Sequence, residues 1–339
     1  MKSINQYVEL FIIFLIKYVL LCVLNYLNDY NVKHKTIVNG QYLVLMSAFF
    51  YGLNPFFAQL LFKEGLDPAM VSLYRFILPA IFFAFFLRTP SDNWPEALRT
   101  LVLGIASGIA IFSYFHALDT IPAATAILIY YSYPVFSVLI GWAVFNRRPS
   151  QNALISAALV AIAASLTVRP ETLPAGSLVS LLACFLAPIT VATQVQYLSN
   201  PKQTLPTSNR MAWMTIGHIV VLLPIALWLA PTQLFPVSSI GFMAVLGIAV
   251  LAAAIPQILF MIGAPRSCAN KNALTGSLEL VVALLTGAVL LGKNLDRLEV
   301  TAMALIVLAL FIKEVNVRVS PDRAPKQGSA THRLKFRSP

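Results

Sequence analysis

The sequence predicts an all-α, polytopic membrane protein, and its composition and its pattern of apolar runs both indicate this class. Hydrophobic residues make up 58% of the 339 positions and charged residues only 11%, with a mean hydropathy of +0.78. A soluble globular domain is nearer half apolar and a quarter charged. Long apolar runs recur from residue 41 to residue 313, with no polar segment large enough for a soluble domain between them. We therefore expect most of the chain to lie within a membrane.

Ten of these runs have about the length of a transmembrane helix, which needs ~20 apolar residues to cross the hydrocarbon core. Turn residues or charges separate them, as in Lys63-Glu64-Gly65 and Arg147-Arg148-Pro149. Prolines at positions 55, 79, 134, 188, 224 and 256 should interrupt six helices, and broken helices expose carbonyl groups that can line a cavity. The expected helices are 41–62, 69–87, 97–116, 122–145, 151–168, 176–198, 211–230, 237–262, 271–291 and 297–313.

The distribution of lysine and arginine predicts the orientation, because cytoplasmic loops carry an excess of these residues. With residue 40 inside and ten helices, seventeen basic residues fall on the inner side and four on the outer side. The four on the outer side are Lys63, Arg169, Lys293 and Arg297. The predicted location is the cytoplasmic (inner or plasma) membrane, with the C-terminus in the cytoplasm.

A weak internal repeat divides the ten helices into two sets of five. Residues 146 positions apart are alike at several points, including Ala123 with Ala269 and Gly141 with Gly287. Five is an odd number, so the second set must lie inverted relative to the first. Inverted repeats recur in secondary transporters, where two related halves rock between inward-open and outward-open states.

The two ends of the chain differ in composition from this body. Residues 1–39 are rich in Asn, Ile, Tyr and Lys, and are interpreted as an accessory hydrophobic leader: a peripheral or eleventh helix, or a misassigned start. Residues 316–339 form a basic tail, which we expect to be disordered and cytoplasmic. The two five-helix repeats are assigned to residues 40–170 and 171–315.

Several other classes of function find little support. The net charge of +11 comes from short loops and the tail, without the basic stripe interleaved with aromatics that is typical of nucleic-acid binding. Cys22, Cys184 and Cys268 are far apart, so neither a disulfide framework nor a metal site is indicated. Gly287 to Lys293 fits the phosphate-loop pattern GxxxxGK, but the pattern lies in an apolar helix and lacks the following hydroxyl residue. No catalytic constellation is visible, and we expect no enzyme activity, no cofactor and no metal.

Three segments resemble the drug/metabolite transporter superfamily, specifically its EamA-type ten-helix members. They are Phe49–Pro55 with Arg75-Phe76, then Ala117–Ala124 with Tyr133-Pro134-Val135, and lastly Leu278–Val282 with Leu290-Leu291-Gly292. The resemblance covers residues 40–315. It implies transport of a small organic metabolite such as an amino acid, and export is common in the family. The chain departs from the family pattern at Arg147 and Lys293, where a glutamate usually closes each repeat's fourth helix, and at Leu280, where a proline is usual.

Glu279 and Arg75 are the two charged residues that lie well inside predicted helices. A carboxylate near the middle of the bilayer is costly and is usually kept for function, so Glu279 could receive a substrate ammonium group or shuttle a proton. The alternative is a structural partner for a neighbouring hydroxyl or amide. Arg75, where the family also tends to have arginine, could bind an anionic group or pair with a carboxylate, or extend its charge toward the outer headgroups.

Aromatic and amide side chains complete the set of candidates. Tyr130, Tyr131 and Tyr133 place three rings midway along the fourth helix, where they could line a substrate cavity or only pack. Asn54 belongs to the first of the three segments that carry the family resemblance. His218 lies within the seventh helix and is interpreted as a structural histidine.

Taken together, the residues and the resemblance predict a secondary transporter that moves a small solute by alternating access. The alternative is a non-transporting membrane partner or scaffold whose transport site has decayed, which the basic residues Arg147 and Lys293 motivate. The expected partners are a small-molecule substrate and the lipid bilayer, and no nucleic acid. The sequence leaves open the coupling to protons, the substrate's identity and the oligomeric state.

Overall fold

The structure is a computed structural model, and it describes residues 40–87, 93–117, 120–121, 123–166, 178–229, 234–292 and 295–312. Regular secondary structure in these ranges consists of helices alone, which confirms the all-α prediction. The proposed leader, 1–39, and the proposed tail, 316–339, lie outside the described residues.

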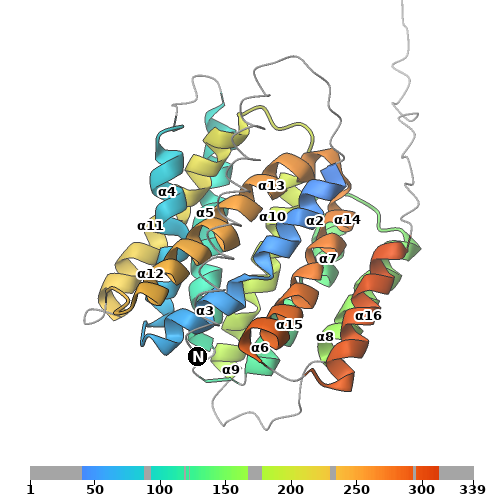
Figure 1. Cartoon of the computed structure of the whole chain (residues 1–339). Coiled ribbons are helices and arrows are strands. Elements are labelled where there is room, and N and C mark those ends of the chain that lie inside the picture. The colour runs from blue at the N-terminus through green and yellow to red at the C-terminus, as the bar shows by residue number, and fades with distance from the viewer. Residues whose placement is uncertain are drawn as a thin grey trace, which may run out of the picture.

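Figure 1 shows the helices arranged side by side in one bundle. The first part of the chain forms α2 (Gly40–Tyr51), α3 (Asn54–Lys63), α4 (Pro68–Ala84), α5 (Trp94–Ala117), α6 (Ala123–Tyr130), α7 (Tyr133–Ala143) and α8 (Gln151–Leu166). The second part forms α9 (Leu178–Cys184), α10 (Leu186–Leu198), α11 (Thr207–Leu229), α12 (Ser239–Leu246), the π-helical η1 (Gly247–Ala254), α13 (Ile255–Gly263), the 3₁₀ turn η2 (Ala264–Arg266), α14 (Ala269–Gly276), α15 (Leu278–Leu291) and α16 (Arg297–Phe311).

Seven continuous or broken helices in the described residues are long and apolar enough to cross a membrane. They are Gly40–Lys63, Trp94–Ala117, Thr125–Ala143, Leu178–Leu198, Thr207–Leu229, Ser239–Arg266 and Ala269–Leu291, and two shorter apolar helices are Pro68–Ala84 and Gln151–Leu166. Each apolar run expected from the sequence overlaps a helix, so the positions of the helices were predictable. The count of ten spans and the inversion of the repeats stay predictions.

Three of the long spans are broken close to proline. α2 and α3 are separated at Gly52-Leu53, and Pro55 lies in the first turn of α3. α6 and α7 are separated at Tyr131-Ser132, and Pro134 lies in the first turn of α7. The third is α9–α10, which is interrupted at Phe185, with Pro188 in the first turn of α10. Proline has no N–H to donate and fits the first turn of a helix, where that donor has no partner inside the helix.

The expectation that all six prolines interrupt their helices was wrong at two positions. Pro79 and Pro224 lie inside the continuous helices α4 and α11. One proline removes a single hydrogen bond, and a long helix within a packed bundle can absorb that loss without ending. Pro256 lies at the start of α13, directly after the π-helical segment η1.

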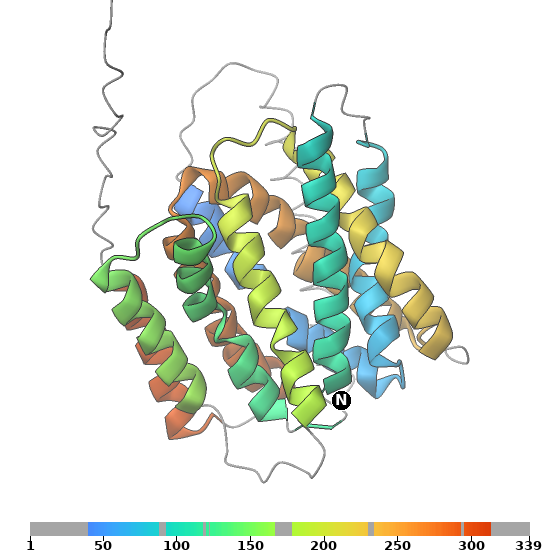
Figure 2. The same cartoon turned by 180° about the vertical axis from the view of Figure 1, so that it is seen from behind.

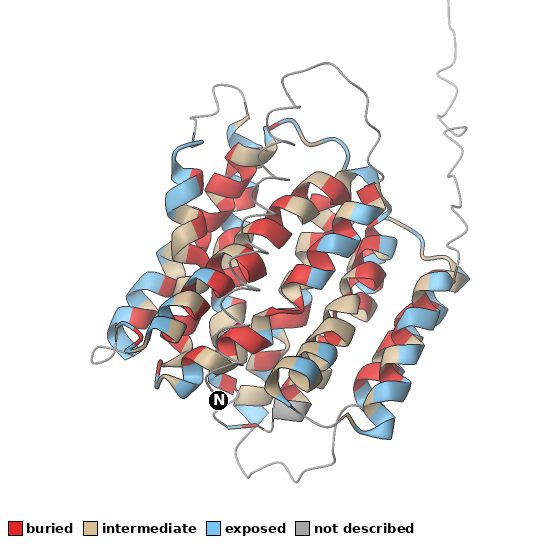
Figure 3. Ribbon diagram, viewed as in Figure 1, coloured by how far each residue is buried: buried red, intermediate tan, exposed pale blue. Residues whose placement is uncertain are grey.

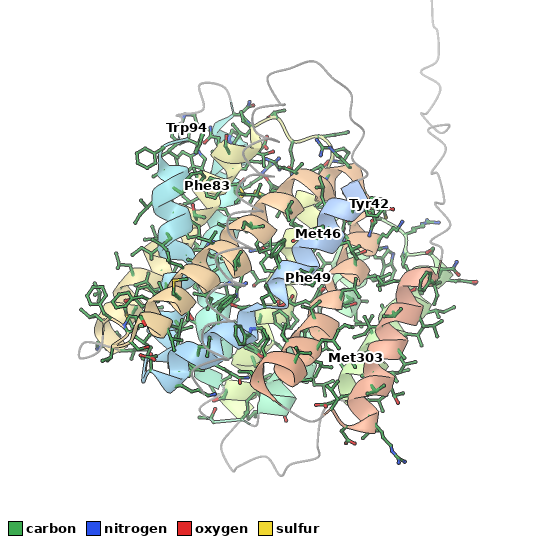
Figure 4. All side chains as sticks on the ribbon, viewed as in Figure 1. Tyr42, Met46, Phe49, Phe83, Trp94 and Met303 are labelled. Carbon is green, nitrogen blue, oxygen red and sulfur yellow. The ribbon has the colours of Figure 1, made fainter. Side chains whose placement is uncertain are left out.

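Large apolar side chains cover the outside of the bundle, and small ones fill many of its contacts (Figures 3 and 4). Tyr42, Met46 and Phe49 project from α2 with 65%, 46% and 42% of their surfaces exposed, whereas Phe83 is buried. Between α8 and α16 the buried residues are mostly alanines. Helices in lipid associate through close packing of small residues, since their large apolar side chains are already well solvated by lipid. The arrangement is therefore that of a membrane protein.

Among the described helices α5 and α11 make the most extensive contact, and glycines allow their backbones to touch. A Cβ atom added at Gly104 would lie 2.1 Å from the carbonyl oxygen of Met214, and one at Gly217 would lie 2.5 Å from that of Leu101. On the other side of the molecule α8 and α16 pack against each other, next to α7 and α14 (Figures 1 and 2). The broken helices α2–α3, α6–α7, α9–α10 and α14–α15 lie between these two pairs.

Candidate functional site

A cavity of about 590 Å³ opens among the broken helices. Its wall includes residues beside the breaks of α2–α3, α6–α7 and α14–α15, and it takes further residues from α4, α5, α10, α11 and α13. The volume lies in the usual range of small-molecule sites, roughly 300–1,000 Å³. All six candidates named from the sequence line this one cavity: Glu279, Arg75, Tyr130, Tyr131, Tyr133 and Asn54.

Glu279 lies next to a break in its helix. α14 ends at Gly276, Ser277 separates the two segments, and Glu279 is in the first turn of α15. A carboxylate in the first turn of a helix is stabilised by the positive end of the helix dipole. A hydrogen bond joins the carboxylate to the Tyr130 side chain, and the Arg75 guanidinium attracts it electrostatically. Glu279 therefore connects α15 to both α6 and α4 at the cavity.

Arg75 projects from α4 between aromatic rings. Its guanidinium carbon lies 5.8 Å from the centroid of the Tyr51 ring and 5.4 Å from that of Phe76, both within cation–π range. Its Nε atom is buried and has no hydrogen-bond partner among the residues that the structure describes. The rings hold the cation at the cavity wall and leave one donor available.

The three candidate tyrosines surround the break between α6 and α7. The ring centroids of Tyr130 lie 5.1 Å from those of Tyr131 and 6.0 Å from those of Tyr133, and Tyr114 of α5 extends the cluster at 5.7 Å from Tyr130. The Tyr133 hydroxyl donates to the carbonyl oxygen of Ala273 at 3.0 Å. Tyr133 thus ties α7 to α14, while Tyr130 contacts the carboxylate of Glu279.

Gly52 and Asn54 lie at the break between α2 and α3, where this broken helix meets α15. A Cβ at Gly52 would lie 2.5 Å from Cβ of Val282 and 2.8 Å from the carbonyl oxygen of Glu279, so only glycine allows this approach to α15. Asn54 is the first residue of α3, and its Oδ1 is buried without a hydrogen-bond partner in the described part of the chain. The break in α2–α3 therefore brings an unpaired amide oxygen to the wall of the cavity that Glu279 also lines.

Gln257 is a cavity residue that the sequence analysis missed. It lies on α13 with only 5% of its side chain exposed, and both its amide oxygen and nitrogen lack partners among the described residues. It is a lone polar side chain within a long apolar run, which is a signal that could have found it. Tyr51 and Tyr114 also line the cavity and were not singled out.

His218, interpreted as structural, also reaches the cavity wall. Its ring stacks on Phe76 with centroids 4.0 Å apart and planes at 4°, and only 1% of the side chain is exposed. The stack joins α11 to α4 beside Arg75. His218 therefore helps to fix the helix that carries the guanidinium.

Arg147, one of the departures from the family pattern, lies away from the cavity wall and forms part of a polar network. Its Nη1 donates to Oε1 of Gln196 at 2.9 Å, while Nε2 of Gln196 donates to the carbonyl oxygen of Ser137 at 2.7 Å and to Oδ1 of Asn270 at 3.2 Å. The arginine thus connects the end of α7 to α10 and α14. Lys293, the second departure, lies outside the described residues.

Comparison with solved structures finds the same fold elsewhere. One crystal structure, described only as that of a protein, superposes with a TM-score of 0.65 at 17% sequence identity, covering 80% of this chain and 95% of the other. At that identity the likeness concerns the fold alone. No curated protein matches the sequence.

The family comparison is more informative, because the same family description fits the chain twice. The EamA-like transporter family matches residues 38–169 and again residues 177–313. Two consecutive matches agree with the two repeats inferred from the sequence, and together they cover most of the chain. They confirm the resemblance described above. The chain is therefore a multi-pass membrane protein, and its family is one of small-molecule transporters. The chain belongs to the EamA-like transporter family.

Proposed function

We propose that the protein is a secondary transporter that moves a small organic metabolite, such as an amino acid, by alternating access. The observation that carries the proposal is the cavity in which Glu279 and Arg75 face a common space of about 590 Å³. An acidic and a basic group with unpaired donors and acceptors beside them suit a solute that carries both an ammonium and a carboxylate. Gln257 and Asn54 offer amide atoms for the rest of such a solute.

Paired features of the two repeats support ten spans in an inverted arrangement. α2–α3 and α9–α10 are broken first helices of their repeats, and α6–α7 and α14–α15 are broken fourth helices. Pro79 and Pro224 lie inside the second helices, α4 and α11. Breaks at corresponding positions of two halves are typical of transporters whose site lies at the repeat interface. The repeats are assigned to 40–170 and 171–315, in the cytoplasmic membrane with the C-terminus inside.

Flux into proteoliposomes tests the function. The purified protein is first screened by thermal shift against the common L-amino acids and related metabolites, and each stabilising compound is then followed as radiolabelled counterflow. We expect at least one compound to exchange across the membrane faster than in protein-free vesicles. Counterflow at several internal pH values would also report on proton coupling. A folded protein that gives no counterflow with any compound would favour the scaffold alternative.

A further inference from the structure

The third helix of each repeat packs mainly against the other repeat. In the first repeat, α5 lies along α9, α10 and α11 of the second, and its contact with α4 of its own repeat is smaller. In the second repeat, α12, η1 and α13 lie along α3, α4 and α2 of the first. We name the set α2, α3, α4, α12, η1 and α13 body A, and the set α9, α10, α11 and α5 body B.

Body A has a continuous apolar core. The largest cluster of buried apolar side chains joins Phe57 and Leu61 of α3 and Val71 of α4 to Ile248 and Leu251 of η1. The same cluster extends at its edge to Leu222 and Ala226 of α11, in body B. At the other end of the body, a Cβ at Gly40 of α2 would lie 2.6 Å from the carbonyl oxygen of Gly263. The second repeat's third helix is therefore packed on the first repeat along its whole length. In body B the glycine contact between α5 and α11 has the same effect.

A glutamate fixes the start of the exchanged helix in body A. Glu64 follows α3, and its Oε1 accepts from the Ser238 hydroxyl at 2.6 Å while its Oε2 accepts from the Ser238 N–H at 3.1 Å. Ser238 is the N-cap of α12, and its hydroxyl oxygen in turn accepts from the N–H of Gly241 at 3.0 Å. Glu64 thus holds the first turn of α12.

Body B has an equivalent contact, in which the acceptor glutamate lies at the start of the exchanged helix and the donors lie in the segment that follows the first helix of the other repeat. Glu96, in the first turn of α5, accepts from the N–H of Thr204 at 2.8 Å, from its hydroxyl at 2.5 Å, and from the N–H of Leu205 at 3.3 Å. Thr204 lies 140 positions after Glu64, and Ser238 lies 142 positions after Glu96. These offsets are close to that between the two family matches, which begin at 38 and 177. The two contacts are therefore counterparts in the two repeats.

We infer that bodies A and B, and not the two halves of the sequence, are the units that move during transport, with Glu64 and Glu96 as equivalent positioning residues that keep each exchanged helix in its body. The inference rests on the proposed alternating-access function. Moving the sequence halves apart would open the apolar core of body A and the backbone contact of α5 with α11. Moving the bodies against each other leaves those contacts in place. It changes the crossing of α4 with α11, where His218 stacks on Phe76 and Leu222 and Ala226 pack on body A, the smaller contacts of α4 with α5 and of α11 with α13, and the contacts around the cavity.

Four exposed sites distinguish the two kinds of motion. Ile81 of α4, Phe242 of α12, Val102 of α5 and Leu227 of α11 expose 56%, 52%, 53% and 55% of their side chains, so each can carry a spin label. Distances are measured by electron paramagnetic resonance on double-cysteine variants in nanodiscs, after the native cysteines are replaced. Pairs 81–242 and 102–227 lie within a body but join different repeats. Pairs 81–102 and 227–242 lie within one repeat but join different bodies.

We expect a single distance population for 81–242 and for 102–227, and two populations for 81–102 and for 227–242. The opposite result would overturn the inference in favour of rocking sequence halves, and single populations in all four pairs would overturn it as well. No substrate is needed, so the result stands apart from the flux assay. If counterflow is absent but the pairs between the bodies still show two distances, the proposed solute transport is contradicted. The assignment of bodies A and B as the moving units is then still supported.

The positioning role is tested by matched variants on the same labels. Glu64→Ala and Ser238→Ala should broaden the 81–242 distribution and leave 102–227 unchanged, and Glu96→Ala should do the reverse. Ser238→Thr keeps the hydroxyl and should restore the narrow 81–242 distribution. Equal broadening of both pairs by either glutamate variant would indicate general destabilisation and contradict the assignment.

Discussion

Glu279 carries the most specific prediction at the scale of single residues. Glu279→Gln keeps the shape of the side chain and most of its hydrogen bonding, but removes the charge that attracts Arg75 and would change partners during the cycle. We expect the variant to fold and its counterflow rate to fall by roughly tenfold or more. A tenfold lower rate corresponds to an activation free energy that is higher by ~1.4 kcal/mol. If protons are coupled through this carboxylate, the variant should also lose the pH dependence of transport.

Glu299 offers a matched control for that measurement. It also lines the cavity, but its carboxylate accepts from the N–H of Asp296 in the capping box of α16. Glu299→Gln should therefore transport at nearly the normal rate and melt at a slightly lower temperature. Normal flux and normal pH dependence in Glu279→Gln would remove Glu279 from the mechanism.

Glu64 gives a prediction about pH, at the edge of the membrane-spanning region. The Ser238 hydroxyl and the Ser238 and Val237 N–H groups hold the pKa of the Glu64 carboxyl below its ordinary value. A carboxyl whose pKa is lower in the folded state contributes stability above its unfolded pKa, about 4.3, and loses that contribution as the pH falls through the folded value. The melting temperature of Glu64→Gln should lie below that of the wild type by a constant margin from about pH 8 to pH 5. The difference between the two melting temperatures should narrow only in more acidic buffer. A margin that already shrinks between pH 8 and pH 6 would contradict the assignment.

At the scale of helices, the break in α2–α3 depends on Gly52. Any side chain there would meet Cβ of Val282 and the backbone of Glu279 at under 3 Å. Gly52→Ala should cost about 1–3 kcal/mol of stability through overpacking and move α3 away from the cavity. Gly108→Ala is the control, since its added carbon would lie 3.2 Å from Cβ of Val221 and needs only a small adjustment. Similar melting temperatures for the two variants would show that the close approach at Gly52 is unimportant.

The positions of the helices could be read from the sequence, but the positions of their breaks only partly. Apolar runs and charged or turn residues mark where helices lie, because each helix is decided locally. Prolines marked three of the breaks, yet Pro79 and Pro224 stay within continuous helices. The break at Ser277 has no proline, and a side chain at Gly276 would lie 2.4 Å from the Tyr133 hydroxyl. That constraint comes from another helix and cannot be seen in a local pattern.

At the scale of the whole molecule, the candidate residues could be predicted one by one, but their contacts with one another could not. A charge or a group of tyrosines inside an apolar run is costly and therefore conspicuous, and these signals selected six residues that all line one cavity. Their partners could not be predicted, because the meeting of Tyr130 with Glu279 depends on how α6 and α15 cross. Gln257 was passed over as one amide in a long apolar helix, although its burial without partners makes it as notable as Asn54.

The orientation of the whole bundle is the last prediction, and it rests on the count of seventeen basic residues against four. In the fold, the start of α8 and the connection between α10 and α11 lie at one end of the bundle, and the end of α5 and the start of α12 lie at the other (Figures 1 and 2). Gln151 and Pro201 are exposed at the first end, and Thr120 and Val237 at the second. The basic excess places the first end in the cytoplasm.

Single cysteines at these four positions, in a protein without its native cysteines, report the orientation directly in intact cells. Thr120→Cys and Val237→Cys should react with an impermeant thiol reagent added outside. Gln151→Cys and Pro201→Cys should react only after the membrane is permeabilised, which also verifies that each thiol is accessible. Since Thr120 belongs to the first repeat and Val237 to the second, labelling of both from one side also tests the register of the two repeats. The reverse pattern would overturn the orientation, and a mixed pattern would overturn the number of spans between them.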